Sequence, residues 1–267
     1  MDSQLLIIII FTFIIHLIGT LAYSARIAGT RTGQIAISFA LFNIMILISR
    51  TSNSFQGPLL GKRIEEGIAY GTATHLESDF RLIILAASVA TIVGIAIMPS
   101  FQRLFTKAVK RFKAYRSMPK LLMRGFTPTG LAHIRNSIAL PTIENVSSIM
   151  KNDRIPIKFI FFNILATAIW TVGVLASLYA GYLEPELRVT SSQLSSIING
   201  VATILMFVFI DPYVAMMTDD VSKGEKTQAY FRRSVILLLV SRLIGTVLAQ
   251  FLLLPAALLI VQVARII

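Results

Sequence analysis

The sequence predicts an all-α polytopic membrane protein with about six transmembrane helices. Hydrophobic residues make up 55% of the 267 positions and charged residues only 14%, whereas a soluble domain carries about a quarter charged residues. The mean hydropathy is +0.75. The charges are also clustered, which leaves apolar runs of roughly 20 residues, the length that crosses a bilayer. We place the spans at residues 4–24, 33–54, 81–99, 157–182, 195–217 and 234–262.

The first span follows a short N-terminus that lacks the basic region and the cleavage site of a signal peptide, so we expect it to be retained. The segment after it contains Arg26, Arg31, two glycines and several hydroxyl side chains. Arginine binds phosphate oxygens in a bidentate manner. The segment is therefore either a site for a pyrophosphate or lipid headgroup, or an ordinary basic turn at the membrane surface.

The second span ends in a polar run, Ser49-Arg50-Thr51-Ser52-Asn53-Ser54, which is soon followed by Pro58. We expect this run to break the helix. Broken backbone at membrane depth persists only against protein or a water-filled cavity, so the run either lines a cavity or lies beyond a span that ends at Ile48. Asn43 and His16, near mid-membrane, are expected to form hydrogen bonds between helices.

The polar segment 100–156 separates the third span from the fourth. Its first part places apolar residues at helical spacing, with basic residues largely on other faces. This pattern is typical of an amphipathic helix in the headgroup plane, and a solvated basic connector is the alternative. The chain then divides into a first three-helix half (1–99), a basic linker (100–156) and a second half (157–267). Such a 3+3 arrangement is compatible with an inverted repeat, although the sequence similarity between the halves is weak.

Two ionisable residues fall inside the last two spans. Asp211 lies in the fifth span and Arg242 in the sixth. A charge at the centre of a membrane helix costs roughly 2.5–3.5 kcal/mol on insertion, so such residues usually face a partner or a cavity. Either Arg242 and Asp211 form a structural ion pair, or Arg242 binds an anion.

The distribution of basic residues predicts the orientation in the membrane. The loops after the first, third and fifth spans, counted with the adjoining span ends, hold 18 of the 25 Lys and Arg residues, and the other side holds 6. Basic residues favour the cytoplasmic side. We therefore expect segment 100–156 in the cytoplasm and both termini outside. The net charge of +12 is explained in the same way, together with anionic lipid, and does not predict nucleic-acid binding.

The sequence contains no recognisable catalytic pattern. It has no cysteine, and its three histidines are far apart, so we predict neither a metal site nor a cofactor. The patterns HExxH, GxSxG and the Walker loop are absent from the sequence. Nothing in it therefore indicates an enzyme.

The stretch HLIGTLAYSARIAGTRTGQIAISFALFNIMILISRTSNSFQGPLLGK, residues 16–62, closely resembles the Amj family of bacterial membrane proteins. The length, the six apolar spans and the basic middle loop also match. The resemblance implies a lipid II flippase of the cytoplasmic membrane, an alternate to the MurJ flippase. Such a protein moves the undecaprenyl-pyrophosphate-linked disaccharide-pentapeptide to the outer leaflet for peptidoglycan synthesis.

The resemblance brings no motif that assigns binding residues, so physical reasoning has to assign them. A pyrophosphate headgroup needs a polar, cationic path through the bilayer. We expect its phosphates to meet two or more of Arg26, Arg31, Arg50 and Arg242. The path is expected to be lined by Asn43, Ser49, Ser52 and Asn53.

Three other functions compete with this hypothesis. The protein could export another amphipathic anion, modify a polyprenyl phosphate, or serve as a scaffold of the cell-wall machinery. Six helices form a small frame for a large headgroup, so a homodimer in contact with membrane lipids is a further hypothesis.

Overall fold

The computed structural model describes residues 2–71, 75–115, 127–139 and 155–267, together with positions 117, 120 and 123. Within this part, six helical segments are long and apolar enough to cross a membrane, and no β-strand is present. The predicted fold class is therefore confirmed. The segments are Ser3–Thr32, Ile35–Tyr70, Leu76–Phe112, Ile157–Leu183, Pro185–Ser222 and Gln228–Ile266.

Several of these segments contain more than one helical element. The first consists of α1 (Ser3–Leu21) and α2 (Tyr23–Thr32), and the fifth joins α9 (Arg188–Leu205) to α10 (Asp211–Ser222) through the π-helical turn Met206–Ile210. The remaining helices are α3 (Ile35–Tyr70), α4 (Leu76–Tyr115), α6 (Pro128–Arg135), α8 (Ile157–Leu183) and α11 (Gln228–Ile266).

Local sequence signals set several helix ends. The Asp2 carboxylate accepts a hydrogen bond from the Leu5 amide at 2.8 Å and caps α1, and Thr227 caps α11 in the same way. Gly33 and Gly71, with φ of 68° and 66°, follow the last residues of α2 and α3. A left-handed residue after a helix favours glycine, which has no Cβ to clash.

The expected break in the second span is wrong, because α3 runs without interruption through residues 49–58 to Tyr70. The hydroxyls of Thr51, Ser52 and Ser54 each donate a hydrogen bond to the carbonyl four residues earlier. These side chains satisfy their polar groups on their own helix. The polar run can therefore stay helical.

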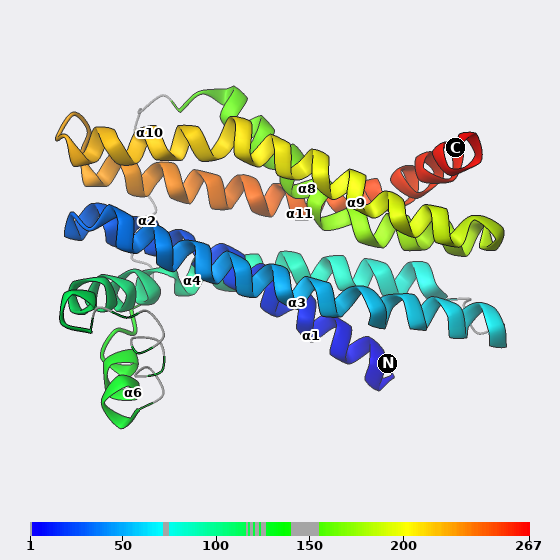
Figure 1. Cartoon of the computed structure of the whole chain (residues 1–267), viewed down its shortest axis with the longest axis horizontal. Coiled ribbons are helices and arrows are strands. Elements are labelled where there is room, and N and C mark those ends of the chain that lie inside the picture. Colours follow the sequence, from blue (N-terminus) through cyan, green and yellow to red (C-terminus); the bar gives the residue numbers. More distant parts are fainter. Residues whose placement is uncertain are drawn as a thin grey trace.

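The basic segment after the third span also begins as a helix, but not as a separate one. Residues 100–115 continue the span within α4. The helix turns away from the line of the span near Pro99, as proline in a helix interior requires (Figure 1). Its place in the headgroup plane stays a prediction, and most of the rest of 100–156 lies outside the described residues.

The helices form two layers (Figure 1). Helices α1 to α4 form one layer, in which α1 packs against both α3 and α4, and α8 to α11 form the other, in which α8 packs against α9 and α11. The largest contact between the layers joins α4 to α11. Both termini lie at the same end of the molecule, and the inverted repeat stays a prediction.

The buried apolar residues form two separate clusters. The termini-side cluster lies toward the chain ends and includes Leu5, Leu60, Phe80, Leu175, Leu194 and Leu253. The loop-side cluster lies toward the opposite end and includes Ile27, Leu41, Met98, Phe159, Val214 and Leu238. Every spanning segment contributes to both clusters, so the middle of each segment lies between two apolar regions.

Candidate functional site

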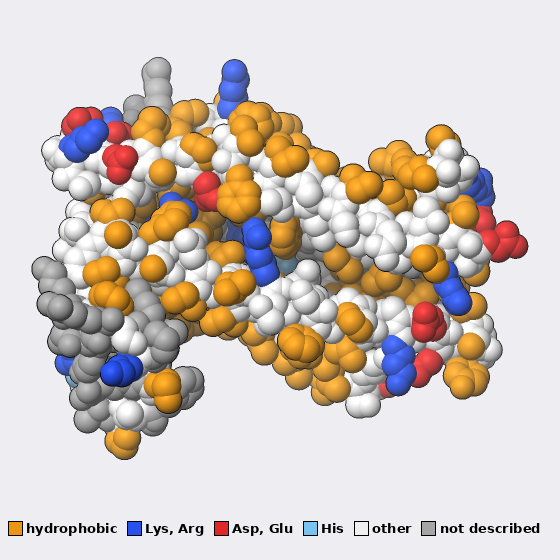
Figure 2. Space-filling model, viewed as in Figure 1, with side chains coloured by type: hydrophobic (Ala, Val, Ile, Leu, Met, Phe, Trp, Pro, Cys, Tyr) orange, Lys and Arg blue, Asp and Glu red, His pale blue; other side chains and the backbone are white. Residues whose placement is uncertain are grey.

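A polar layer separates the two apolar clusters. Buried polar side chains from five of the spanning segments lie here: Thr12, His16, Thr20, Gln56, Ser88, Thr91, Asn163, Thr167, Thr171, Ser241 and Thr246. Figure 2 shows a furrow between the two layers of helices in which basic, acidic and histidine side chains are visible. Most other charged side chains on this face lie at the two ends of the molecule. The middle of this membrane protein is therefore its most polar buried region.

Hydrogen bonds in the polar layer tie α3 to α1. The Gln56 amide donates to the Thr12 hydroxyl at 2.6 Å, and the Ser49 hydroxyl donates to the Ile15 carbonyl at 3.0 Å. A buried polar group without a partner is costly, so such bonds fix the relative position of the two helices. Ser49, expected to line the path, is thus engaged by α1.

A second set of hydrogen bonds involves α11. The Ser88 hydroxyl of α4 donates to the Thr246 hydroxyl at 3.0 Å, and the Asn163 amide of α8 donates to the Ser241 hydroxyl at 2.7 Å. α11 is therefore bonded to both layers at mid-height.

Glycines allow these helices to approach closely. A Cβ at Gly245 would lie 2.7 Å from the Ile164 carbonyl oxygen, and a Cβ at Gly94 would lie 2.7 Å from the Thr20 methyl carbon. Small residues at helix crossings are typical of membrane bundles, where close backbone packing supplies much of the stabilisation.

Arg242 lies in the polar layer without an anionic partner. Its guanidinium packs over Gly19 of α1, where a Cβ would come within 2.9 Å of Nη2. Among the described residues it makes no ion pair or hydrogen bond, and its buried Nε has no partner. His16 lies close enough to interact with it electrostatically, and Nδ1 of that buried imidazole also has no partner.

Asp211 pairs with Arg26, so the first of the two alternatives for Arg242, an ion pair with Asp211, is wrong. Arg26 Nη2 lies 3.4 Å from the carboxylate of Asp211. The guanidinium also lies over the rings of Phe39 and Phe42, at 4.8 and 4.3 Å from their centroids. The physical reason is packing: α10 contacts α2, so the carboxylate meets the arginine of the first segment.

Arg50 of α3 contacts aromatic side chains of the second layer of helices. Its guanidinium lies 5.5 Å from the Trp170 ring centroid and 5.8 Å from that of Phe207, in a side chain that remains exposed. Asp211 interacts electrostatically with both Arg26 and Arg50. Arg50 thus extends from α3 toward the second layer without an ion pair of its own in the described chain.

Of the four arginines expected to bind phosphate, three are close to shared neighbours and one is not. Tyr23 interacts electrostatically with both Arg26 and Arg242, and Asp211 links Arg26 to Arg50. Arg31, at the end of α2, is exposed and donates a hydrogen bond to the Gln102 side chain at 3.0 Å. It therefore belongs to the loop-side end of the bundle.

The remaining expected lining residues have mixed positions. Asn53 lines a cavity of about 30 Å³, room for roughly one water molecule. Among the residues that the structure describes, Ser52 bonds only to its own helix, and Asn43 is exposed and makes no hydrogen bond. The predicted interhelical hydrogen bonds of Asn43 and His16 are therefore wrong within the described chain.

A family match is consistent with this architecture. The model of the family described as "Amj: Alternate to MurJ" matches residues 11–264. The chain belongs to the Amj family. A curated relative, Lipid II flippase Amj of Bacillus subtilis (strain 168), is 38% identical over 256 residues, which cover 96% of this chain and 94% of that protein. No solved structure matches the chain.

Sequence reasoning missed several residues of the polar layer in this Amj protein. Gln56, Trp170 and Asn163 were not assigned to a site. A signal existed for each: Gln56 follows an apolar span, Trp170 is the only tryptophan, and Asn163 begins a polar i, i+4, i+8 series with Thr167 and Thr171. Across the described ranges, no group of three potential metal-binding side chains converges.

Proposed function

We propose that this Amj protein is a lipid II flippase that moves the undecaprenyl-pyrophosphate-linked precursor from the inner to the outer leaflet. The observation that carries the proposal is the near full-length similarity to the Bacillus subtilis flippase. The chemistry of the polar layer supports it. A headgroup of phosphates, sugars and peptide would lose several kcal/mol for each unsatisfied polar group in hydrocarbon.

The arginines of the layer are suited to the pyrophosphate. Among the described residues, no carboxylate forms an ion pair with Arg242 or Arg50, so their charge is available to a phosphate. Arginine presents a planar donor array that matches phosphate oxygens. Arg26 is held by Asp211 and would join only when that carboxylate releases it. Arg31, at the loop-side end, would make the first contact with the headgroup.

The proposed direction of transport requires the loop-side end to face the cytoplasm and both termini to face outward. In that orientation a negative-inside potential favours export of an anion, by roughly 2.3 kcal/mol per charge per 100 mV. Because the chain has no cysteine, Lys223→Cys and Glu186→Cys are single reporters for the two ends. An impermeant thiol reagent added outside intact cells should label only the Glu186→Cys variant.

A homodimer would enlarge the frame around the headgroup and remains part of the proposal. Cross-linking of the purified protein in membranes, over a range of protein-to-lipid ratios, tests it. A cross-linked species of twice the monomer mass at low protein-to-lipid ratio supports the dimer, and monomers alone contradict it.

Translocation by the purified protein is the decisive experiment. Vesicles containing fluorescent lipid II are treated with an impermeant quencher, and the protected fraction reports movement between leaflets. We expect alanine variants at Arg242 and Arg50 to slow movement. Arg188→Ala, which changes an exposed arginine near the outer end, is the matched control. If variants at Arg26, Arg31, Arg50 and Arg242 all behave like the wild type, the proposed site is wrong.

A further inference from the structure

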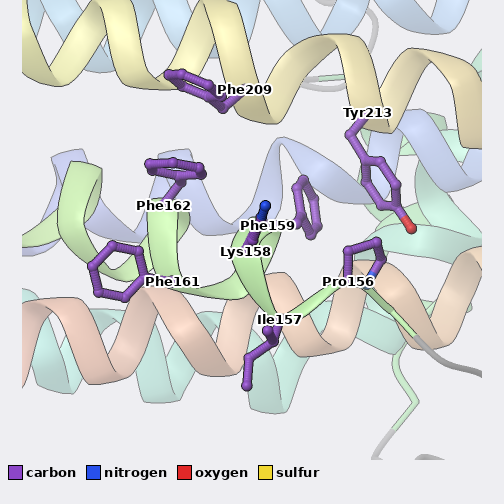
Figure 3. Close-up of a pocket in the computed structure, with 8 residues that line it drawn as sticks. All are labelled: Pro156, Ile157, Lys158, Phe159, Phe161, Phe162, Phe209 and Tyr213. Carbon is purple, nitrogen blue, oxygen red and sulfur yellow. The ribbon is translucent and has the colours of Figure 1, made fainter.

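A groove of about 700 Å³ opens between the first turns of α8 and the π-helical turn that leads into α10 (Figure 3). Pockets that hold small molecules usually measure about 300–1,000 Å³. The groove is distinct from the small cavity in the polar layer. Its lining contains one cation and five rings: Lys158, Phe159, Phe161, Phe162, Phe209 and Tyr213.

The rings are held in place by contacts across the groove. Phe162 of α8 stacks on Phe209 with centroids 4.3 Å apart and an interplanar angle of 17°. Phe159 contacts Tyr213 of α10, also with centroids 4.3 Å apart. Phe209 belongs to the π-helical turn, a feature often found at functional sites. Both pairs join α8 to the fifth segment, so the groove is a built surface of two helices.

The groove combines an apolar wall with a single charge at its edge. Lys158 is exposed in the first turn of α8, where the fourth span begins, and it makes no ion pair with any other described residue. A surface that only faces lipid needs to be apolar, but it needs no hollow and no stacked aromatic rings. The groove has both. A long apolar chain that carries an anionic head is complementary to both parts.

The groove and the candidate site share one stretch of the fifth spanning segment. Phe209 and Tyr213 flank Asp211, the residue that pairs with Arg26. Phe159 lines the groove and also belongs to the loop-side cluster together with Tyr23. A lipid whose chain lies in the groove would thus be held by the same stretch of helix that carries the partner of Arg26.

We propose that this groove binds the first isoprenoid units of a polyprenyl phosphate lipid, with Lys158 against the phosphate. This assignment rests on the proposed function for the identity of the lipid. An isoprenoid unit has a flat double bond and a methyl branch, which pack against ring faces by dispersion. Tail recognition and headgroup recognition then involve different residues.

Photolabelling of the full-length protein in lipid nanodiscs tests the groove. The probe is a polyprenyl monophosphate with a photoreactive group in its first units, and labelled residues are identified by mass spectrometry. We expect labels at the start of α8 and near Phe209. Unlabelled polyprenyl monophosphate should compete, and phosphatidylglycerol, an anionic lipid with acyl chains, should not.

Variants separate the two parts of the groove. Loss of both stacked rings in Phe162→Ala/Phe209→Ala should reduce labelling about tenfold, since each aromatic contact contributes about 0.5–1.5 kcal/mol. Phe161→Ala, at an exposed position, repeats the test if the double variant does not fold. Phe251→Ala, which removes an exposed ring on α11, is the control. Lys158→Gln should weaken competition by polyprenyl phosphate and leave competition by the uncharged polyprenol unchanged.

Two results would contradict the proposal that the groove binds a polyprenyl phosphate. The first is labelling elsewhere in the chain, and the second is competition by phosphatidylglycerol as strong as that by polyprenyl monophosphate. Groove labelling without lipid II translocation would support the groove and refute the flippase proposal. Lipid II translocation together with labels outside the groove would support the flippase proposal and refute the groove proposal.

Discussion

Replacement of Arg242 by glutamine should separate transport from stability. The guanidinium makes no ion pair or hydrogen bond with another described residue. Its loss leaves no described carboxylate unpaired, so we expect the free energy of unfolding to fall by less than about 1 kcal/mol. It can even rise, because an arginine at the centre of a span costs roughly 2.5–3.5 kcal/mol on insertion. Lipid II translocation should instead fall roughly 10- to 100-fold, since a hydrogen bond to a charged group contributes about 1.5–3 kcal/mol.

Arg26→Gln is the matched comparison, because Arg26 has the partner that Arg242 lacks. Its side chain is 5% exposed, and its guanidinium lies 3.4 Å from the Asp211 carboxylate and covers two phenylalanine rings. Removing it leaves a partly buried carboxylate alone, which should lower the free energy of unfolding by about 1–3 kcal/mol. The double variant Arg26→Gln/Asp211→Asn should recover part of this loss.

Thermal unfolding in one detergent and translocation in vesicles measure the two effects on the same preparations. The two variants should differ in opposite ways. Arg242→Gln should be about as stable as the wild type but slow in translocation, whereas Arg26→Gln should be less stable. If Arg242→Gln unfolds as easily as Arg26→Gln, the guanidinium has a structural partner. Wild-type translocation by Arg242→Gln would remove this residue from the phosphate route.

Three further predictions follow from particular contacts. Gly245→Ala should destabilise the protein by about 1–3 kcal/mol in thermal unfolding, because the new methyl group would lie 2.7 Å from a backbone carbonyl oxygen of α8. Gly200→Ala, which has open space around it, should be neutral or stabilising in the same assay. Gln228→Ala should increase thiol labelling of reporters at the loop-side end, because the Gln228 side chain accepts a hydrogen bond from the Thr30 hydroxyl and donates one to the Thr30 carbonyl across the layers. Gln250→Ala should increase labelling at the termini-side end by less, because it removes the bond donated to the Arg81 carbonyl but keeps the backbone carbonyl that accepts from the Arg81 side chain; unchanged labelling in both variants would contradict this. A hydrogen bond from the Leu5 amide in the first turn of α1, and then one from Arg63 of α3, lower the pKa of Asp2. The ionised Asp2 carboxylate therefore stabilises the fold above its unfolded pKa, and this stabilisation is lost as the pH falls below about 4. The melting temperatures of Asp2→Asn and the wild type should converge in acid.

The number and order of the spanning helices could be predicted from the sequence because apolar length and scarce charge determine them. Helix ends were harder to predict. The run Ser49–Ser54 was expected to break the second span, yet its hydroxyls bond to their own helix and α3 continues. Residues 100–115 were expected to form a helix and do, but hydropathy does not reveal that this helix continues the third span.

The candidate site could be predicted in its residue types but not in its pairings. Arg50, Arg242 and Asp211 were recognisable because charges are rare within spans. The partner of Asp211 depends on which helices pack together, and Arg26 precedes it by 185 residues. Arg31 has the same chemistry as Arg26, but one helical segment carries them to different depths.

The division of the buried apolar residues into two clusters has a consequence for leakage. One apolar cluster lies on either side of the polar layer, and no residue belongs to both. Separate clusters would allow the side chains of one to move apart around a bulky solute while the other stayed closed to protons and ions. A single continuous core would have to loosen along its whole length for the same passage.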